Sequence, residues 1–88
     1  MNGAHVFQSN ITVTLRKSIL DPQGKAVEHA IHSLGYSPVE GVRIGKHIQL
    51  SINSPSKEEA ERITDDVCKK LLANMVMEDY TFTVEKVR

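Results

Sequence analysis

The clearest pattern near the start of the chain is a strict alternation of apolar and polar residues. Ile11, Val13 and Leu15 alternate with two threonines and Arg16. A period of two residues is typical of a β-strand with one buried and one solvated face. The same alternation returns over residues 80–85, where apolar side chains again occupy every second position. The sequence therefore predicts one strand near each end of the chain.

A helix is predicted soon after the first strand. Asp21 can cap its first turn, and Pro22 suits the first helical position because no amide proton is needed there. Apolar residues then recur at spacings of three and four, as on one face of a helix: Ala26, Val27, Ala30, Ile31 and Leu34. Gly35 can take the left-handed conformation that ends a helix.

The middle of the chain, residues 39–52, places its apolar residues on even positions, with an interruption at Gly45, Lys46 and His47. Two strands joined by a three-residue loop at 45–47 keep the apolar faces of both strands on the same side of a hairpin. One long bent strand preserves the same parity. We favour the hairpin, and the single strand is the alternative.

A second helix is predicted to start at Ser54, with Pro55 first, or at Ser56, with Glu59 completing a capping box. Its apolar stripe follows the helical period: Ala60, Ile63, Val67, Leu71 and Leu72. Asn74 is the predicted end of this helix.

The predicted order, strand–helix–strand–strand–helix–strand, is that of an α+β, ferredoxin-like split β-α-β domain (βαββαβ). Such a domain has an antiparallel sheet with two helices on one face. We expect one domain over residues 1–88, with residues 1–9 forming either an N-terminal extension or a lengthened first strand. The opposite face of the sheet, with Thr12, Thr14, Thr81 and Thr83, is a polar surface that a second copy could cover.

Composition narrows the choice of partners. The 11 basic residues balance the 11 acidic ones, so no strong field attracts nucleic acid or an anionic membrane surface. No apolar stretch approaches the ~20 residues of a membrane span, and the start of the chain lacks the pattern of a signal peptide. The single cysteine cannot form an internal disulfide. These features favour a protein of the reducing cytoplasm.

Few residues are candidates for catalysis or metal binding. Cys68 lies at the flank of the second apolar stripe and is interpreted as a half-buried packing residue rather than an activated thiolate. His29 and His32 are one helical turn apart but point away from the apolar stripe, and no cysteine or carboxylate completes a metal site. Tyr80 and Phe82 share one strand face and are expected in the core, not on an RNA-binding surface. We therefore predict no catalytic residue and no metal site.

One segment is more specific than the rest. Asp21 to Lys25 begins a helix, yet Gly24 weakens a helix by about 1 kcal/mol relative to alanine, which suggests that something packs closely against its backbone. The blocks Asp21-Pro22-Gln23-Gly24-Lys25-Ala26, Leu34-Gly35-Tyr36, Val42-Arg43-Ile44-Gly45-Lys46, Leu71-Leu72-Ala73-Asn74 and Glu78-Asp79-Tyr80 together resemble the PurS family. The resemblance covers about residues 11–84. Met75 and Met77 depart from the proline and isoleucine common in that family.

The resemblance implies a non-catalytic scaffold in the three-part phosphoribosylformylglycinamidine synthase of purine biosynthesis, an ATP-dependent C–N ligase. In that assembly a PurL-type synthetase binds ATP and formylglycinamide ribonucleotide, and a PurQ-type glutaminase supplies ammonia. The small subunit would bridge them as a homodimer or tetramer and help retain ammonia. It would bind no cofactor itself, while the complex uses ATP and Mg. It would work in the cytoplasm, without nucleic acid or membrane.

Matching to the family's motifs places seven residues at contacts with partners or with a second protomer: Asp21, Gln23, Gly24, Arg43, Gly45, Lys46 and Asn74. None is assigned chemistry. Arg43 and Lys46 are candidates to pair with carboxylates across such a contact, and the fixed fork of arginine is the more directional. The main alternative is an amino-acid-sensing domain of the ACT type, which has the same element order and predicts that an amino acid raises the melting temperature.

Overall fold

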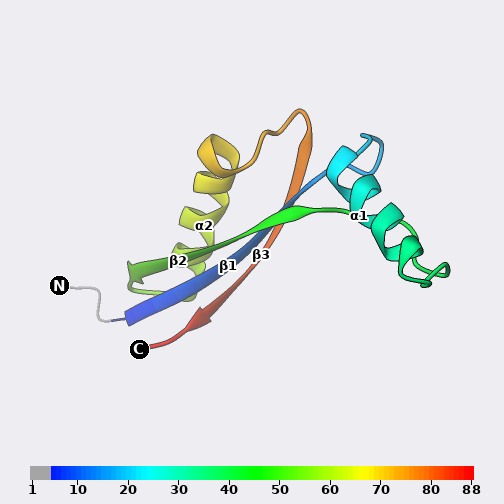
Figure 1. Cartoon of the computed structure of the whole chain (residues 1–88). Coiled ribbons are helices and arrows are strands. Elements are labelled where there is room, and N and C mark those ends of the chain that lie inside the picture. The colour runs from blue at the N-terminus through cyan, green and yellow to red at the C-terminus, as the bar shows by residue number, and fades with distance from the viewer. Residues whose placement is uncertain (1–4) are drawn as a thin grey trace.

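The computed structural model describes residues 5–88 and contains a three-stranded antiparallel sheet and two helices (Figure 1). The elements are β1 (His5–Leu15), α1 (Pro22–Ser33), β2 (Gly45–Ser54), α2 (Lys57–Val67), the π-helical turn η1 (Cys68–Leu72) and β3 (Glu78–Lys86). β1 lies in the centre of the sheet, in the order β2-β1-β3. The antiparallel sheet and the helix order are as the sequence predicts. No helix within residues 5–88 is long and apolar enough to span a membrane.

The core lies between α2 and one face of the sheet. Ile11, Val13 and Phe7 on β1 are at most 4% exposed and face two completely buried residues of the helical segment, Ala60 and Cys68. Tyr80 and Phe82 are half-buried against the same core, which confirms that they are core residues. The threonines at 12 and 81 pair with each other on the opposite face of the sheet and are exposed.

The predicted hairpin is wrong, and the single-strand alternative describes residues 45–54 correctly. Gly45, Lys46 and His47 lie within β2, where they pair with residues 14, 13 and 12 of β1. A two-residue period looks the same in a hairpin and in one long strand, because both keep the apolar parity. Residues 39–44 form no strand. The sheet therefore has three strands instead of the four of the βαββαβ pattern.

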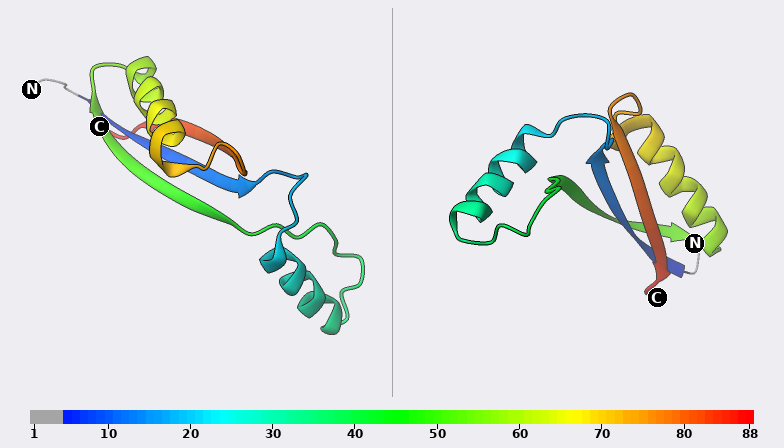
Figure 2. Two further views of the ribbon diagram at one scale, coloured as in Figure 1. Left: turned by 90° about the horizontal axis from the view of Figure 1, so that it is seen from above. Right: turned by 90° about the vertical axis from the view of Figure 1, so that its right-hand side faces the viewer.

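The first helix also departs from the prediction. Its bounds are as expected, with Asp21 as the N-cap and Gly35 at φ 98° just beyond its end. It does not cover the sheet, however: the views in Figures 1 and 2 show α1 projecting beyond one end of the sheet, while α2 alone packs on the face. Only Gly24 is buried in α1, and Val27 and Leu34 of its apolar stripe are exposed.

The second helix starts at Ser56, whose hydroxyl accepts a hydrogen bond from the Glu59 amide. The π-helical turn at Cys68–Leu72 then changes the phase of the stripe. Leu72 stays half-buried, whereas Leu71, expected in the core, is 77% exposed. Cys68 is completely buried, not half-buried as predicted.

The protruding helix makes the chain long and thin. Its extents are 55 × 27 × 14 Å and its radius of gyration is 17.0 Å. A compact domain of this length has a radius of gyration of about 12 Å. Of the predicted extension or lengthened first strand at residues 1–9, residues 5–9 form the start of β1 and add to the length, whereas residues 1–4 lie outside the described residues. The chain therefore buries less of its surface than its size allows.

Candidate interaction site at the strand–helix junction

Asp21 connects the protruding helix to the sheet. One carboxylate oxygen accepts the amide proton of Gly24 at 3.0 Å, which caps α1, and the other accepts that of Ile44 at 2.8 Å. The residue is only 3% exposed. These two amides, Ile44 foremost, lower the pKa of the Asp21 carboxyl, because both hydrogen bonds favour its ionised form. Asp21 is therefore a fixed bridge between α1 and the segment that enters β2.

Gly24 lies directly against that same segment. A β-carbon at this position would come within 2.1 Å of the Val42 carbonyl oxygen. The prediction of a close backbone contact at Gly24 is therefore confirmed. Glu28, one turn later, accepts hydrogen bonds from the amides of Gly41 and Val42 at 3.1 and 3.3 Å. Helix α1 and residues 41–44 are thus held together as one unit.

Arg43 holds the turn that leads from β1 into α1. Its Nη2 atom donates to the carbonyl oxygens of Arg16 and Ile19 at 2.7 and 2.8 Å, and to that of Leu15 at 3.3 Å. The guanidinium therefore serves contacts within the chain. Its predicted pairing with a carboxylate across an interface stays a prediction.

Gly45 begins β2 at a tight contact with the central strand. A β-carbon there would lie 2.5 Å from the Val13 carbonyl oxygen and from the Thr14 methyl carbon. Lys46 follows, opposite Val13 in the register of the two strands. Together with Asp21, Gly24 and Arg43, these residues form the junction through which α1 is attached to the sheet.

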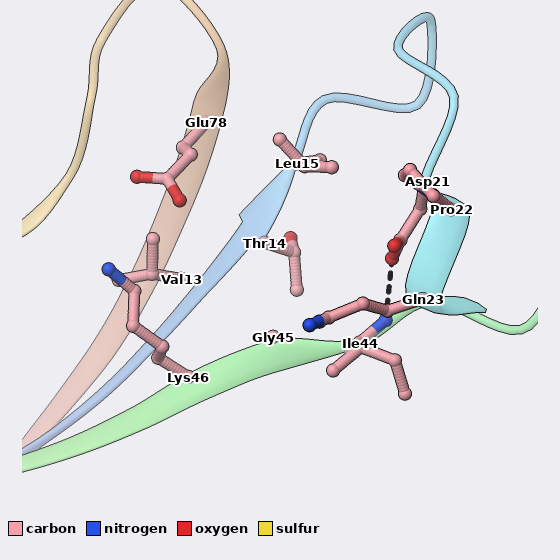
Figure 3. Close-up of a pocket in the computed structure, with 10 residues that line it drawn as sticks. All are labelled: Val13, Thr14, Leu15, Asp21, Pro22, Gln23, Ile44, Gly45, Lys46 and Glu78. Atoms are coloured by element: carbon pink, nitrogen blue, oxygen red, sulfur yellow. Dashed lines mark hydrogen bonds between the residues drawn. The ribbon is translucent and has the colours of Figure 1, made fainter. Parts of the chain in front are cut away.

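A cavity of about 310 Å³ opens at this junction (Figure 3). Lys46 and Glu78 extend toward each other across it from β2 and β3. Ten residues line it: Val13, Thr14, Leu15, Asp21, Pro22, Gln23, Ile44, Gly45, Lys46 and Glu78. Four of them, Asp21, Gln23, Gly45 and Lys46, are among the seven predicted contact residues. More than half of the predicted contact residues thus lie around one cavity. Glu78 and Ile44 belong to the motif blocks but were not among the predicted contact residues, because no local pattern shows which distant elements will meet.

Asn74 lies outside the cavity, in the turn before β3. Its side-chain oxygen accepts the amide protons of Val76 and Met77 at 3.0 and 3.3 Å. Its own amide donates to Glu78 at 2.8 Å, so it supports a residue that lines the cavity. Asn74 is therefore a turn-forming residue joined indirectly to the other six.

The residues of reactive type are either buried in the core, as Cys68 is, or exposed on the surface, as His29 and His32 are. Burial, and secondarily the charge of Asp65, raises the pKa of the Cys68 thiol, which keeps it in its poorly nucleophilic protonated form. His29 and His32 are exposed, as expected, and His32 contacts the Val39 carbonyl oxygen at 2.6 Å. Across residues 5–88, no three side chains of metal-ligating type converge.

Fold and junction together define a small α+β domain in which one helix packs on a three-stranded antiparallel sheet and the motif residues fix a second helix that points outward. The chain belongs to the PurS family: the family model described as PurS, phosphoribosylformylglycinamidine (FGAM) synthase, matches residues 8–86. The phosphoribosylformylglycinamidine synthase subunit PurS of Bacillus subtilis is 45% identical over 82 residues, 93% of this chain and 96% of that protein.

Solved structures agree with this assignment. PurS of Thermus thermophilus superposes with a TM-score of 0.84 at 38% identity, covering 94% of this chain and 99% of that chain. A chain in the structure of PurLQS from Thermotoga maritima gives a TM-score of 0.81 at 33% identity, covering 93% and 98%. The shared fold includes nearly all of this chain, so the family assignment applies to the domain as a whole.

Proposed function

We propose that this chain is the non-catalytic scaffold subunit of a glutamine-dependent phosphoribosylformylglycinamidine synthase in purine biosynthesis. It bridges a PurQ-type glutaminase and a PurL-type synthetase and assists the transfer of ammonia between them. The observation that carries this proposal is the family match over residues 8–86, supported by the PurLQS structure. The same match favours this function over an amino-acid-sensing domain.

The physical advantage of a scaffold lies in effective concentration. Ammonia released into solvent is diluted and protonated, whereas a glutaminase held beside the synthetase delivers it locally. In this proposal ATP and Mg are bound by the synthetase and not by this subunit. The assembly works in the cytoplasm. The single, unpaired cysteine of this chain agrees with that location.

The scaffold acts as a homodimer or tetramer. Support comes from α1, whose stripe residues Val27 and Leu34 are 39% and 75% exposed, with Tyr36 nearby at 60%. The accessible surface of the chain is 6082 Å², roughly 900 Å² more than the ~5,200 Å² typical of a monomer of this mass. One partner contributes about 800 Å² to a standard protein interface. A second copy packed on α1 would account for the excess.

Assembly is the direct test. The three proteins are mixed in pairs and all together, and their masses are measured by sedimentation. The proposal predicts that synthetase and glutaminase enter one particle only when this chain is present, and that the particle contains two or more copies of it. Equal co-sedimentation of the two large subunits without this chain would count against a bridging role.

A further inference from the structure

One chain builds only part of the four-stranded, two-helix domain that its sequence pattern describes. The sheet has the order β2-β1-β3, and α2 alone packs on its face, while α1 projects beyond one end (Figures 1 and 2). The predicted hairpin would place residues 39–44 beside β2, but β2 is an edge strand. One strand position and one helix position are therefore open.

The parts that would fill these positions are present but lie elsewhere. Residues 39–44 form no strand and are tied to α1 through hydrogen bonds to Asp21 and Glu28. The chain then runs straight into β2, where Gly45 already pairs with Thr14 of β1, so it does not turn back on itself. Domain swapping exchanges an identical element between two copies. An opened hairpin whose helix is carried away from the sheet is the arrangement that such an exchange requires.

We propose that two copies of this chain exchange α1 together with residues 39–44 across a two-fold axis near Lys46. Residues 39–44 of each copy pair antiparallel with β2 of the other, and α1 covers the sheet face of the other copy beside α2. Ile44 of one copy then lies opposite Ile48 of its partner, which is the register of the predicted hairpin formed between two chains. The proposal rests on the homo-oligomeric scaffold function above and specifies what the copies exchange.

The two edges of the sheet differ in a way that favours this partner. Free edges are usually protected by charged residues, proline or bulges against pairing with another chain. Edge strand β3 has charged residues near both of its ends: Glu78, Asp79, Glu85 and Lys86. Edge strand β2 contains no proline and, after Lys46, no acidic residue, lysine or arginine. Its ten residues are therefore suited to accept a further strand, and an antiparallel strand pair is self-complementary across a two-fold axis.

The exchange also explains which apolar side chains are left partly uncovered. Ile48 and Leu50 of β2 are half-buried, and Ile44 just before the strand is 39% exposed. These even-numbered residues share one face of the extended chain, on the side where α2 packs. Val27 and Leu34 of α1 are exposed as well. In the exchanged dimer the apolar stripe of α1 from one copy covers the apolar edge of the sheet in the other.

A pair of introduced cysteines tests the register in the full chain. Ile44 and Ile48 are four residues apart along the extended chain, about 13 Å, whereas a disulfide needs Cα atoms within about 7 Å. The double variant Ile44→Cys with Ile48→Cys should therefore form a covalent dimer on oxidation, seen in denaturing electrophoresis without reductant. The control is Ile44→Cys with Ser51→Cys, which is three residues out of register and should stay monomeric there. Cys68 is completely buried in both variants.

A lengthened hinge tests the same proposal without cysteines. Insertion of a short glycine- and asparagine-rich turn between Lys46 and His47 allows residues 39–44 to fold back on their own β2. The mass of this variant in sedimentation should fall to half that of the wild-type dimer, with helix content by circular dichroism unchanged. This measurement decides the question independently if the cysteine pairs disturb folding.

Several results would overturn the exchange. A disulfide within one chain of the 44/48 variant would show a closed hairpin, and equal cross-linking of the 44/48 and 44/51 variants would show that the register is wrong. A wild-type chain with the mass of a monomer, or a lengthened-hinge variant that keeps the wild-type mass, would also contradict the proposal. Bridging of the two catalytic subunits is measured separately on the wild-type chain. Its failure would remove the scaffold function and leave the exchange standing.

Discussion

Replacement of Gly24 by alanine tests the junction most sharply, because two effects oppose each other there. Alanine in a helix is favoured over glycine by about 1 kcal/mol, so an unobstructed site would gain stability. At Gly24 the new β-carbon would lie 2.1 Å from the Val42 carbonyl oxygen, far inside the roughly 3.5–4 Å of a good non-bonded contact. Overpacking of this kind costs about 1–3 kcal/mol, and here the obstacle is backbone, which yields less readily than a side chain.

The upper part of that range less the helical gain is a net loss of about 2 kcal/mol in the free energy of unfolding. For a domain of this size the melting temperature should fall by roughly 8–16 °C. His29→Ala on an exposed position of α1 is the control and should change stability by less than about 0.5 kcal/mol. Both are measured by thermal and denaturant unfolding. A Gly24→Ala protein as stable as the wild type, or more so, would refute the close contact between α1 and the segment before β2.

Three further substitutions examine other parts of the structure. Arg43→Lys should lower stability by about 1–2 kcal/mol in denaturant unfolding, because the shorter lysine side chain leaves its ammonium short of the three carbonyl oxygens that Nη2 of Arg43 reaches; an unchanged midpoint would contradict this. Ser9 and Thr64 share a buried hydrogen bond at 2.5 Å, so Thr64→Val should cost about 1–3 kcal/mol, and the double change Ser9→Ala with Thr64→Val should recover part of it. Hydrogen bonding to Asp65 raises the pKa of Tyr80 from 10.0 to about 12, so the folded state holds this proton more tightly than the unfolded state. The contribution of this hydrogen bond to the free energy of unfolding is fully present below pH 10.0 and is lost as the pH rises toward about 12. Tyr80→Phe should flatten this part of the stability curve, and an equally steep decline would show that the pair does not cause it.

Local sequence patterns predicted most of the elements and their ends, because capping and periodicity act over a few residues. Asp21, Gly35 and Ser56 mark helix ends as expected. The position of α1 was not predictable in this way. An amphipathic stripe shows that a face is to be covered but not whether the cover comes from the same chain. The prediction of both helices on one sheet face assumed that a single chain completes the domain.

The candidate site was predictable as a set of motifs but not as a geometry. Gly24 signalled a close contact through its low helix propensity, whereas the partner, Val42, lies on a segment far along the chain. The bond from the Ile44 amide to Asp21 has no sequence signature at all. Leu71 was misplaced because a π-helical turn shifts the helical phase without a recognisable local pattern. Long-range backbone contacts thus account for the unpredicted geometry at Gly24 and Asp21, and the π-helical turn accounts for the exposure of Leu71.

The most direct measurement compares two nitrogen sources. Purified synthetase and glutaminase subunits are assayed for formylglycinamidine ribonucleotide with glutamine, and separately with saturating ammonium, each with and without this chain. A scaffold that joins the two catalytic subunits should raise the glutamine-driven rate by about tenfold or more and leave the ammonium-driven rate nearly unchanged. An equal glutamine-driven rate in its absence, or turnover of glutamine by this chain alone, would contradict the account.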